Sequence, residues 1–194
     1  KEWDPSIKLQ RYNVRSNVDI KITNTTKLRI NIGGYLQERN STPESVSEIF
    51  NRAFRAVPFK FPVQYSTGEI AGTEESNVWA MATQRGYNRT TASKIETLVT
   101  LEQDFKFLTE GLKLRASFSF DRYATGTVSR STKPTLYNPA SGRNEDGSLI
   151  LTVKENGSNT LGHSNSGTYG NKSVYLEAAV TYDRTFDRKH AVSG

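Results

Sequence analysis

The run Leu112-Lys113-Leu114-Arg115-Ala116-Ser117-Phe118-Ser119-Phe120-Asp121 decides the fold. Apolar and polar residues alternate along it without a break, and successive side chains of a β-strand point to opposite faces. The run therefore predicts a strand with one apolar and one polar face. Because the polar face carries charges at both ends, and unpaired charges do not enter a dry core, we expect that face to meet water or polar partners.

The same alternation predicts further strands. They are expected at Tyr12–Thr23, Leu28–Arg39, Lys94–Phe107 and Val174–Asp183, with the first residues of another at Ala191–Gly194. Short turns are expected at Asn24-Thr25-Thr26, Thr109-Glu110-Gly111 and Phe186–His190. Two long connections, residues 40–92 and 125–172, separate the remaining strands. Connections of that length are normally functional.

A short amphipathic helix is expected in the first long connection. Thr42-Pro43-Glu44 predicts its N-cap and first turn, and apolar residues then follow at helical spacing from Val46 to Val57. Pro58 and Pro62 are expected to end it.

Composition narrows the class of protein. The chain has 194 residues, a formal net charge of +6 and no cysteine, which excludes disulfides and thiol chemistry. No segment approaches the ~20 apolar residues of a spanning helix, whereas strands of a membrane barrel need only ~9–11 alternating residues. Lys and Arg are spread along the chain without a basic helix or an RNP-type motif, so nucleic-acid binding is not expected.

The order of short and long connections points to a membrane barrel. Short turns alternate with long connections, as do the periplasmic turns and extracellular loops of outer-membrane proteins. We therefore predict an all-β fold, with residues 1–194 forming about five strands of an antiparallel transmembrane β-barrel. The expected lipid-facing residues are Ile30, Leu114, Phe118 and Val180, and the expected lumen-facing residues are Asn31, Arg115, Ser119 and Thr181. So few strands cannot close a wide barrel, so the others are expected elsewhere in a longer chain.

Three blocks of sequence resemble one family of outer-membrane transporters. The first is Tyr12-Asn13-Val14-Arg15-Ser16-Asn17-Val18-Asp19 with Thr25-Thr26-Lys27-Leu28 and Asn31-Ile32-Gly33-Gly34; the second is Arg85-Gly86-Tyr87-Asn88-Arg89 leading into Leu101–Leu112; the third is Tyr182-Asp183-Arg184-Thr185-Phe186. Together they are similar to the strands and short turns of SusC/RagA-type TonB-dependent transporters. The chain departs from that pattern at Asn77-Val78-Trp79-Ala80 and throughout residues 125–172.

The resemblance implies a fold, a function and partners. The fold is a 22-stranded barrel with an N-terminal plug, of which this chain would hold neither the plug nor the TonB-contacting segment. The function is import of oligosaccharides or peptides across the bacterial outer membrane, energised by the TonB complex. The partners are a SusD-type surface lipoprotein as lid, lipid and lipopolysaccharide, and the glycan or peptide substrate, with a dimer of transporter–lid pairs as one arrangement. Which substrate is carried stays open.

Aromatic and polar residues of the long connections are the candidate substrate contacts, because rings stack on sugars and peptides. They are Trp79, Arg85, Tyr87, Tyr137 and Tyr169. Loop packing, or an aromatic belt at the membrane interface, is the plainer explanation for each aromatic residue.

Catalytic, metal and cofactor sites are not expected. His163 and His190 lack the spacing of metal ligands, and Gly167–Ser173 lacks the Gly-Lys-Ser/Thr adjacency of a phosphate loop. The carboxylates of Glu74-Glu75, Glu102 and Asp104 are more simply solvated, so an enzyme is not predicted. The alternative to a transporter is a secreted or surface β-sandwich that binds glycans with its apolar strand faces turned inward.

Overall fold

The chain folds mainly into one large antiparallel sheet. The computed structural model describes residues 3–57 and 59–194, with backbone alone at positions 165 and 166. Strands hold 60% of the residues and helices 8%, so the expected all-β class is confirmed. The main sheet has six strands in the order β1-β2-β4-β5-β8-β9. Their bounds are β1 Lys8–Lys21, β2 Thr26–Ser41, β4 Gly86–Asp104, β5 Leu112–Ser131, β8 Gly162–Phe186 and β9 His190–Ser193.

The chain divides into two compact units. Unit 1 holds the residues up to Gln10 together with Glu38–Thr90 and Gly126–Gly167, and unit 2 holds Arg11–Gln37, Thr91–Thr125 and Thr168–Gly194. The three short turns, at residues 22–25, 105–111 and 187–189, belong to unit 2. The two long connections, at residues 42–85 and 132–161, belong to unit 1. The predicted alternation of short and long connections is therefore confirmed.

Cross-strand hydrogen bonds set the register within unit 2. The hydroxyls of Thr100 on β4 and Ser117 on β5 lie 3.4 Å apart, and the Phe105 amide donates to the Leu112 carbonyl (2.9 Å) where this hairpin closes. Between β2 and β4 the Thr26 hydroxyl donates to the Gln103 side chain (2.7 Å). Side chains alternate between the two faces of a strand. This register therefore places the apolar residues of successive strands on one face of the sheet and the polar residues on the other.

The turns of unit 2 are built from local hydrogen bonds. Asp187 and Arg188 have φ of 47° and 55°, the left-handed values of a type I′ turn, and the Lys189 amide donates to the Phe186 carbonyl (3.0 Å). The tight turn expected between Phe186 and His190 is thus confirmed. β4 ends at Asp104 and not at Phe107 as expected, because the Asp104 carboxylate accepts the Lys106 amide (3.1 Å) and starts the turn.

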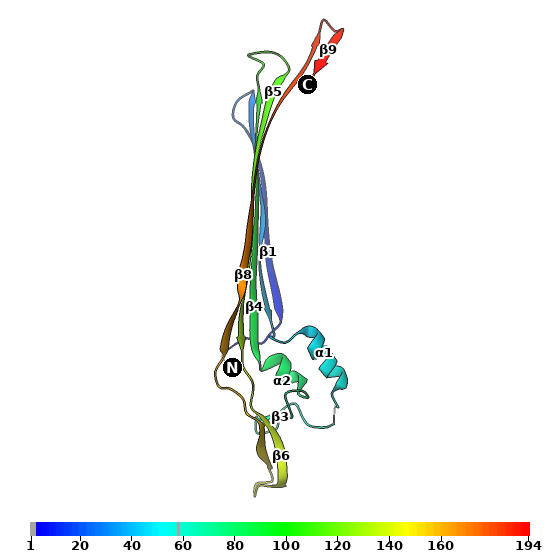
Figure 1. Ribbon diagram of the computed structural model, residues 1–194, viewed down its shortest axis with the longest axis vertical. Coiled ribbons are helices and arrows are strands. Elements are labelled where there is room, and N and C mark those ends of the chain that lie inside the picture. Colours follow the sequence, from blue (N-terminus) through cyan, green and yellow to red (C-terminus); the bar gives the residue numbers. More distant parts are fainter. Residues whose placement is uncertain (1–2, 58) are drawn as a thin grey trace. The chain divides into compact units, whose positions relative to one another are not determined.

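Unit 1 contains two helices and a small second sheet. The helices are α1 (Val46–Arg55) and α2 (Val78–Thr83), which lie side by side (Figure 1). The small sheet consists of β3 (Ile70–Ala71), β6 (Leu136–Arg143) and β7 (Leu149–Glu155), with β3 parallel to β6 and β7 antiparallel to it. β3, β6, β7 and α2 were not predicted, because their segments are short and mix polar with apolar residues without a clear period.

The predicted helix start is wrong by one turn. Helix α1 begins at Val46 after the N-cap Ser45, whose hydroxyl accepts the Glu48 amide (3.1 Å). Thr42, the expected cap, is buried and donates instead to the Met81 carbonyl (3.4 Å). The helix ends at Arg55; Pro58, one of the two prolines expected to end it, lies outside the described residues, and Pro62 lies further along the chain.

The predicted bounds of both long connections are also wrong. Strand β4 begins at Gly86, β5 continues to Ser131 and β8 begins at Gly162, so residues 86–92, 125–131 and 162–172 belong to strands. Polar side chains pair across β4 and β5 here: Ser129 donates to Asn88, and the hydroxyls of Thr90 and Thr127 lie 2.9 Å apart. These extensions carry no apolar alternation, so their residues did not reveal them.

Candidate functional site

One face of unit 2 is lined by polar and charged side chains. Three hollows of about 450, 430 and 540 Å³ lie along it. Their lining includes all four residues expected to face a lumen, Asn31, Arg115, Ser119 and Thr181. Leu114, expected on the opposite face, borders the last hollow between Lys113 and Arg115. We call this surface the polar face.

Charges of both signs are paired on the polar face. Arg29 lies 3.4 Å from Glu102 and 3.8 Å from Asp19, and Lys94 lies 2.5 Å from Glu96. The Arg11 guanidinium stacks 3.9 Å from the centre of the Tyr35 ring. A surface with matched charges, an aromatic ring and many amides suits neutral polar ligands better than a strongly charged one.

The opposite face of unit 2 is apolar and uncovered. Side chains of β1 and β8 on this face are largely exposed: Val14 by 64%, Leu176 by 77% and Val180 by 63%. Other apolar residues of this face that are also exposed are Tyr12, Val18, Ile20, Ile22, Ile32, Leu36, Ile95, Phe118 and Val174. We call it the apolar face. Monomeric soluble proteins rarely expose so large an apolar surface.

Unit 2 has almost no apolar core of its own. Among the described residues, the buried apolar side chains are Tyr65, Ala71, Ala80, Met81, Ala92 and Leu136. All but Ala92 belong to unit 1. The apolar residues of unit 2 are therefore arranged to meet something other than the described residues.

A cluster of charges joins the two long connections in unit 1. Arg85 just precedes β4, and only 12% of its side chain is exposed. It is ion-paired with Glu44, which just precedes α1, and its Nη2 lies 2.7 Å from the Glu74 carboxylate. Lys133, in the other long connection, reaches the same carboxylate at 3.5 Å, and Glu155 accepts the Glu74 amide (3.1 Å). We call these five residues the loop cluster.

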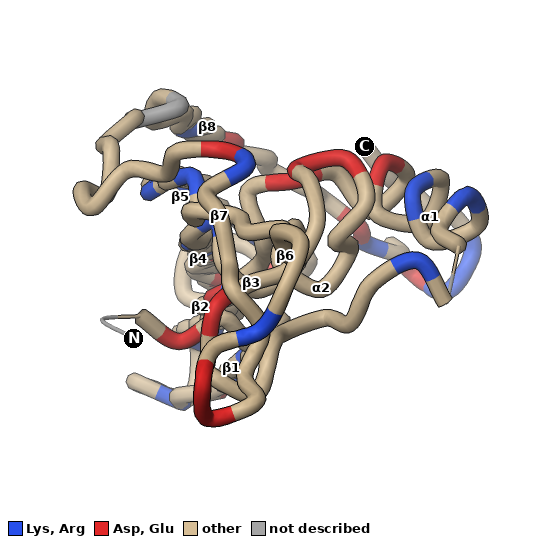
Figure 2. The backbone as a smooth tube through the Cα atoms, turned by 90° about the horizontal axis from the view of Figure 1, so that it is seen from below, with Lys and Arg blue, Asp and Glu red and all other residues tan. Residues whose placement is uncertain are grey.

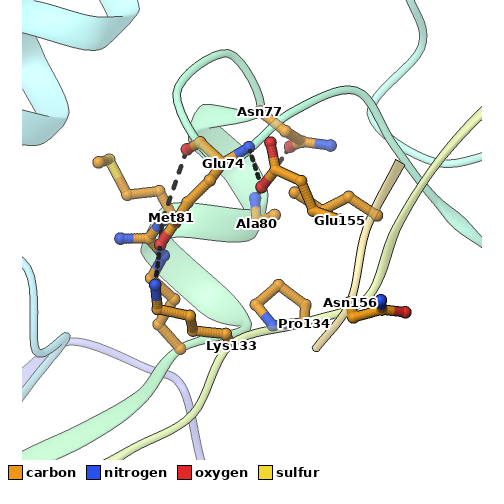
Figure 3. Close-up of a pocket in the computed structure, with 10 residues that line it drawn as sticks. Glu74, Asn77, Ala80, Met81, Lys133, Pro134, Glu155 and Asn156 are labelled. Atoms are coloured by element: carbon orange, nitrogen blue, oxygen red, sulfur yellow. Dashed lines mark hydrogen bonds and ion pairs between the residues drawn. The ribbon is translucent and has the colours of Figure 1, made fainter. Parts of the chain in front are cut away.

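The loop cluster surrounds a cavity of about 310 Å³, drawn in Figure 3. Besides the four cluster residues Glu74, Arg85, Lys133 and Glu155, it is lined by Asn77, Ala80, Met81, Pro134, Leu136 and Asn156. Each cation at the cavity already faces a carboxylate, so these ion pairs stabilise the packing of the connections. We therefore interpret the cavity as part of a structural contact between the long connections.

Asn77 organises the surroundings of this cavity. Its side chain is buried, donates to the carbonyls of Val63 (2.8 Å) and Ala71 (2.7 Å), and accepts the Ala80 amide (2.9 Å). That last bond caps α2. One local sequence signal for this role is the Asn directly before Val78, because Asn is a preferred N-cap residue, although α2 was not predicted from it. Nothing local in the sequence pairs Arg85 with Glu44 or Glu74, or Lys133 with Glu74.

The five residues predicted to contact substrate lie on different elements of the fold. Arg85 belongs to the loop cluster. Trp79 is half-buried in α2, Tyr87 lies on β4 with the Arg89 guanidinium 5.6 Å from its ring centre, and Tyr137 lies on β6. Tyr169 belongs to unit 2, is 59% exposed and lies 6.3 Å from the ring of Tyr123. Their role in binding stays a prediction.

Acidic and basic residues are interspersed through the loops of unit 1 (Figure 2). In the part of the chain that the structure describes, no group of three or more His, Cys, Asp or Glu side chains could hold a metal ion. Within the same residues no helix is long and apolar enough to cross a membrane. Comparison of the sequence with protein-family models finds no match, and comparison with curated proteins finds none either.

Proposed function

We propose that this chain is part of the wall of a transmembrane β-barrel in a bacterial outer membrane. The observation that carries the proposal is the exposed apolar face of unit 2, a unit that has almost no buried apolar core. Withdrawing a Val, Leu or Phe side chain from water contributes about 1.5–3 kcal/mol. A face with so many of them is stable in lipid, while the polar face meets a wet or plugged lumen.

The open edges of the main sheet support the same proposal. β1 is an edge strand, and every one of its residues is exposed. An unpaired strand edge in hydrocarbon would leave backbone groups without partners, at several kcal/mol each. Further strands of the same barrel supply those partners in the proposed assembly.

The proposed barrel is an importer of the SusC/RagA type. It carries oligosaccharides or peptides, is energised by TonB and is covered outside by a SusD-type lipoprotein. The resemblance supports this, because its first block lies on β1 and β2, its second runs from the start of β4 to the turn before β5, and its third ends β8. The long connections of unit 1 are then extracellular and meet substrate or lid.

A pair of adjacent labels on β8 tests the orientation. The chain has no cysteine, so Leu176→Cys and Glu177→Cys each give a single site for a spin label in outer membranes. The Leu176 label should be reached by oxygen, which concentrates in lipid, and the Glu177 label by a water-soluble nickel complex. Equal access of the nickel complex to both labels would reject the barrel. Uptake of labelled oligosaccharides and peptides then separates the substrate classes.

The second candidate is a glycan-binding β-sandwich. The small sheet β3-β6-β7 supports it, because this sheet holds the buried side chains of Ala71 and Leu136. A sandwich folds in water, so the chain should refold in buffer without detergent into a monomer that unfolds cooperatively. Aggregation without detergent and recovery within the rest of the barrel would exclude it.

A further inference from the structure

Helix α1 presents an apolar stripe that no described residue covers. Val46, Phe50 and Phe54 recur every four residues and therefore lie along one side of the helix. They are exposed by 55%, 60% and 86%, and Phe59, just beyond the helix, by 91%. The half-buried residues Ile49, Arg52 and Ala56 mark the other side of the helix.

The charges around the stripe leave an excess of positive charge. Glu48 and Glu75 both pair with Arg52, at 2.6 and 3.5 Å, and Glu44 is paired with Arg85, so Arg55 and Lys60 leave this segment with an excess of one positive charge. Arg55 and Lys60 are exposed and have no ion pair among the described residues. Each directly follows one of the two most exposed phenylalanines, Phe54 and Phe59.

We propose that α1 and the turn after it lie on an anionic lipid surface. The phenylalanines enter the boundary between headgroups and acyl chains, and Arg55 and Lys60 meet lipid phosphates. Exposed rings next to exposed cations match the chemistry of that boundary, which takes up apolar side chains to a depth of about 5–10 Å and attracts basic ones. The inference adds to the connection that carries α1 a lipid contact that transport does not require, so either proposal can fail without the other.

A spin label on the exposed side of α1 tests the proposal. Ser47 is exposed next to the stripe, so Ser47→Cys reports on it, and Glu145→Cys in the β6–β7 turn is the matched control. The full chain is mixed with vesicles of phosphatidylcholine or of an equimolar mixture of phosphatidylcholine and phosphatidylglycerol. In the anionic mixture the Ser47 label should gain access to oxygen and lose access to a water-soluble nickel complex, while the Glu145 label stays exposed to water.

Charge reversal separates lipid from the other occupants. With Arg55→Glu and Lys60→Glu together, the ratio of lipid-protected to water-exposed label should fall by about 25-fold or more, since each basic residue near an anionic surface contributes roughly a factor of five. A Ser47 label that stays open to the nickel complex overturns the proposal. So does equal protection in pure phosphatidylcholine that charge reversal leaves unchanged. Protection that rises with protein concentration without vesicles would assign the stripe to a second copy of the chain.

Discussion

Arg85 holds the first long connection together through ion pairs to Glu44 and Glu74, and only 12% of its side chain is exposed. Replacing it by Met should leave Glu44 and Glu74 without their main partner and destabilise unit 1 by about 2–3 kcal/mol, below the 3–5 kcal/mol of a fully buried pair because both carboxylates are partly exposed. Hydrogen exchange of the amides between residues 42 and 85 measures this. Arg39→Met, at an exposed arginine of the same unit, should leave those amides unchanged. Equal effects of both variants would show that the ion pairs of Arg85 do not stabilise unit 1.

Of the adjacent glycines Gly33 and Gly34, only Gly34 lies where the neighbouring strand leaves no space for a side chain. A Cβ on Gly34 would collide with the Lys94 carbonyl oxygen of the neighbouring strand, whereas a Cβ on Gly33 would meet nothing within 4 Å. Gly34→Ala should therefore push β2 and β4 apart and cost about 1–3 kcal/mol, while Gly33→Ala should be neutral or slightly stabilising. Denaturant unfolding of the two variants in detergent measures the difference. Equal losses would mean that the strands do not approach as closely as described.

Asp4 couples the segment before β1 to pH. Its carboxylate accepts the Ser6 amide (2.9 Å) and lies 3.2 Å from Lys8, and bonds from Ser6, followed by the bond from Lys8, lower its pKa from 3.8 to about 2. A lowered folded-state pKa means that this contribution to stability is complete above pH 3.8 and is lost as the pH falls through about 2. Exchange of the Ser6 amide should accelerate relative to a free peptide over that interval. In Asp4→Asn the acceleration should disappear.

At the scale of the strand, the two faces of β8 differ in their tolerance of charge. Val180 lies on the apolar face and Thr181 lines a hollow on the polar face. If the apolar face meets lipid, Val180→Arg should cost about 2–4 kcal/mol near the membrane midplane. Thr181→Arg, on the next residue, should cost much less. Unfolding in lipid vesicles compares them, and similar costs would contradict the orientation.

At the same scale, the sheet explains why its strands remain paired where their sequences lose alternation. Near Asn88 and Thr90 both faces of β4 are polar, and cross-strand hydrogen bonds to Ser129 and Thr127 replace apolar packing. Polar cross-strand pairs of this kind contribute about 0.2–1 kcal/mol each. Apolar alternation in the sequence therefore ends before the strand does.

At the scale of the whole molecule, most of the second long connection can be removed without cutting a strand of the main sheet. The Ser158 amide donates to the Lys133 carbonyl (2.8 Å), so the two ends of the segment already meet. Replacing residues 134–157 by Asn-Gly should keep the main sheet and its membrane insertion. It removes β6, β7 and Leu136, so the amides between residues 42 and 85 should exchange faster. Uptake or lid binding should weaken.

Two measurements read that replacement. Fractionation of outer membranes reports insertion, and uptake of labelled substrate reports transport. A variant that fails to insert would show that the connection is needed for folding. Unchanged uptake with an intact lid would show that it has no part in transport. Glu145→Gln, in the exposed β6–β7 turn, should behave as the unaltered chain does.

The sequence by itself determined the strands whose faces differ and the short turns between them. The alternation from Leu112 to Asp121 predicted the heart of β5, because a period of two residues is a local property of an extended chain. The turn at Asn24-Thr25-Thr26 and the one before His190 were predicted for the same reason, since turn chemistry lies in a few adjacent residues.

Only the tertiary structure decided where the strands end and what the long connections hold together. β4 begins at Gly86 because β5 lies beside it. Arg85 stabilises the first long connection because Glu44 and Glu74, from other parts of that connection, form ion pairs with it. β3 exists because β6, more than sixty residues further along the chain, offers it a parallel partner. These features depend on contacts between residues far apart in sequence, and such contacts leave no period in the chain itself.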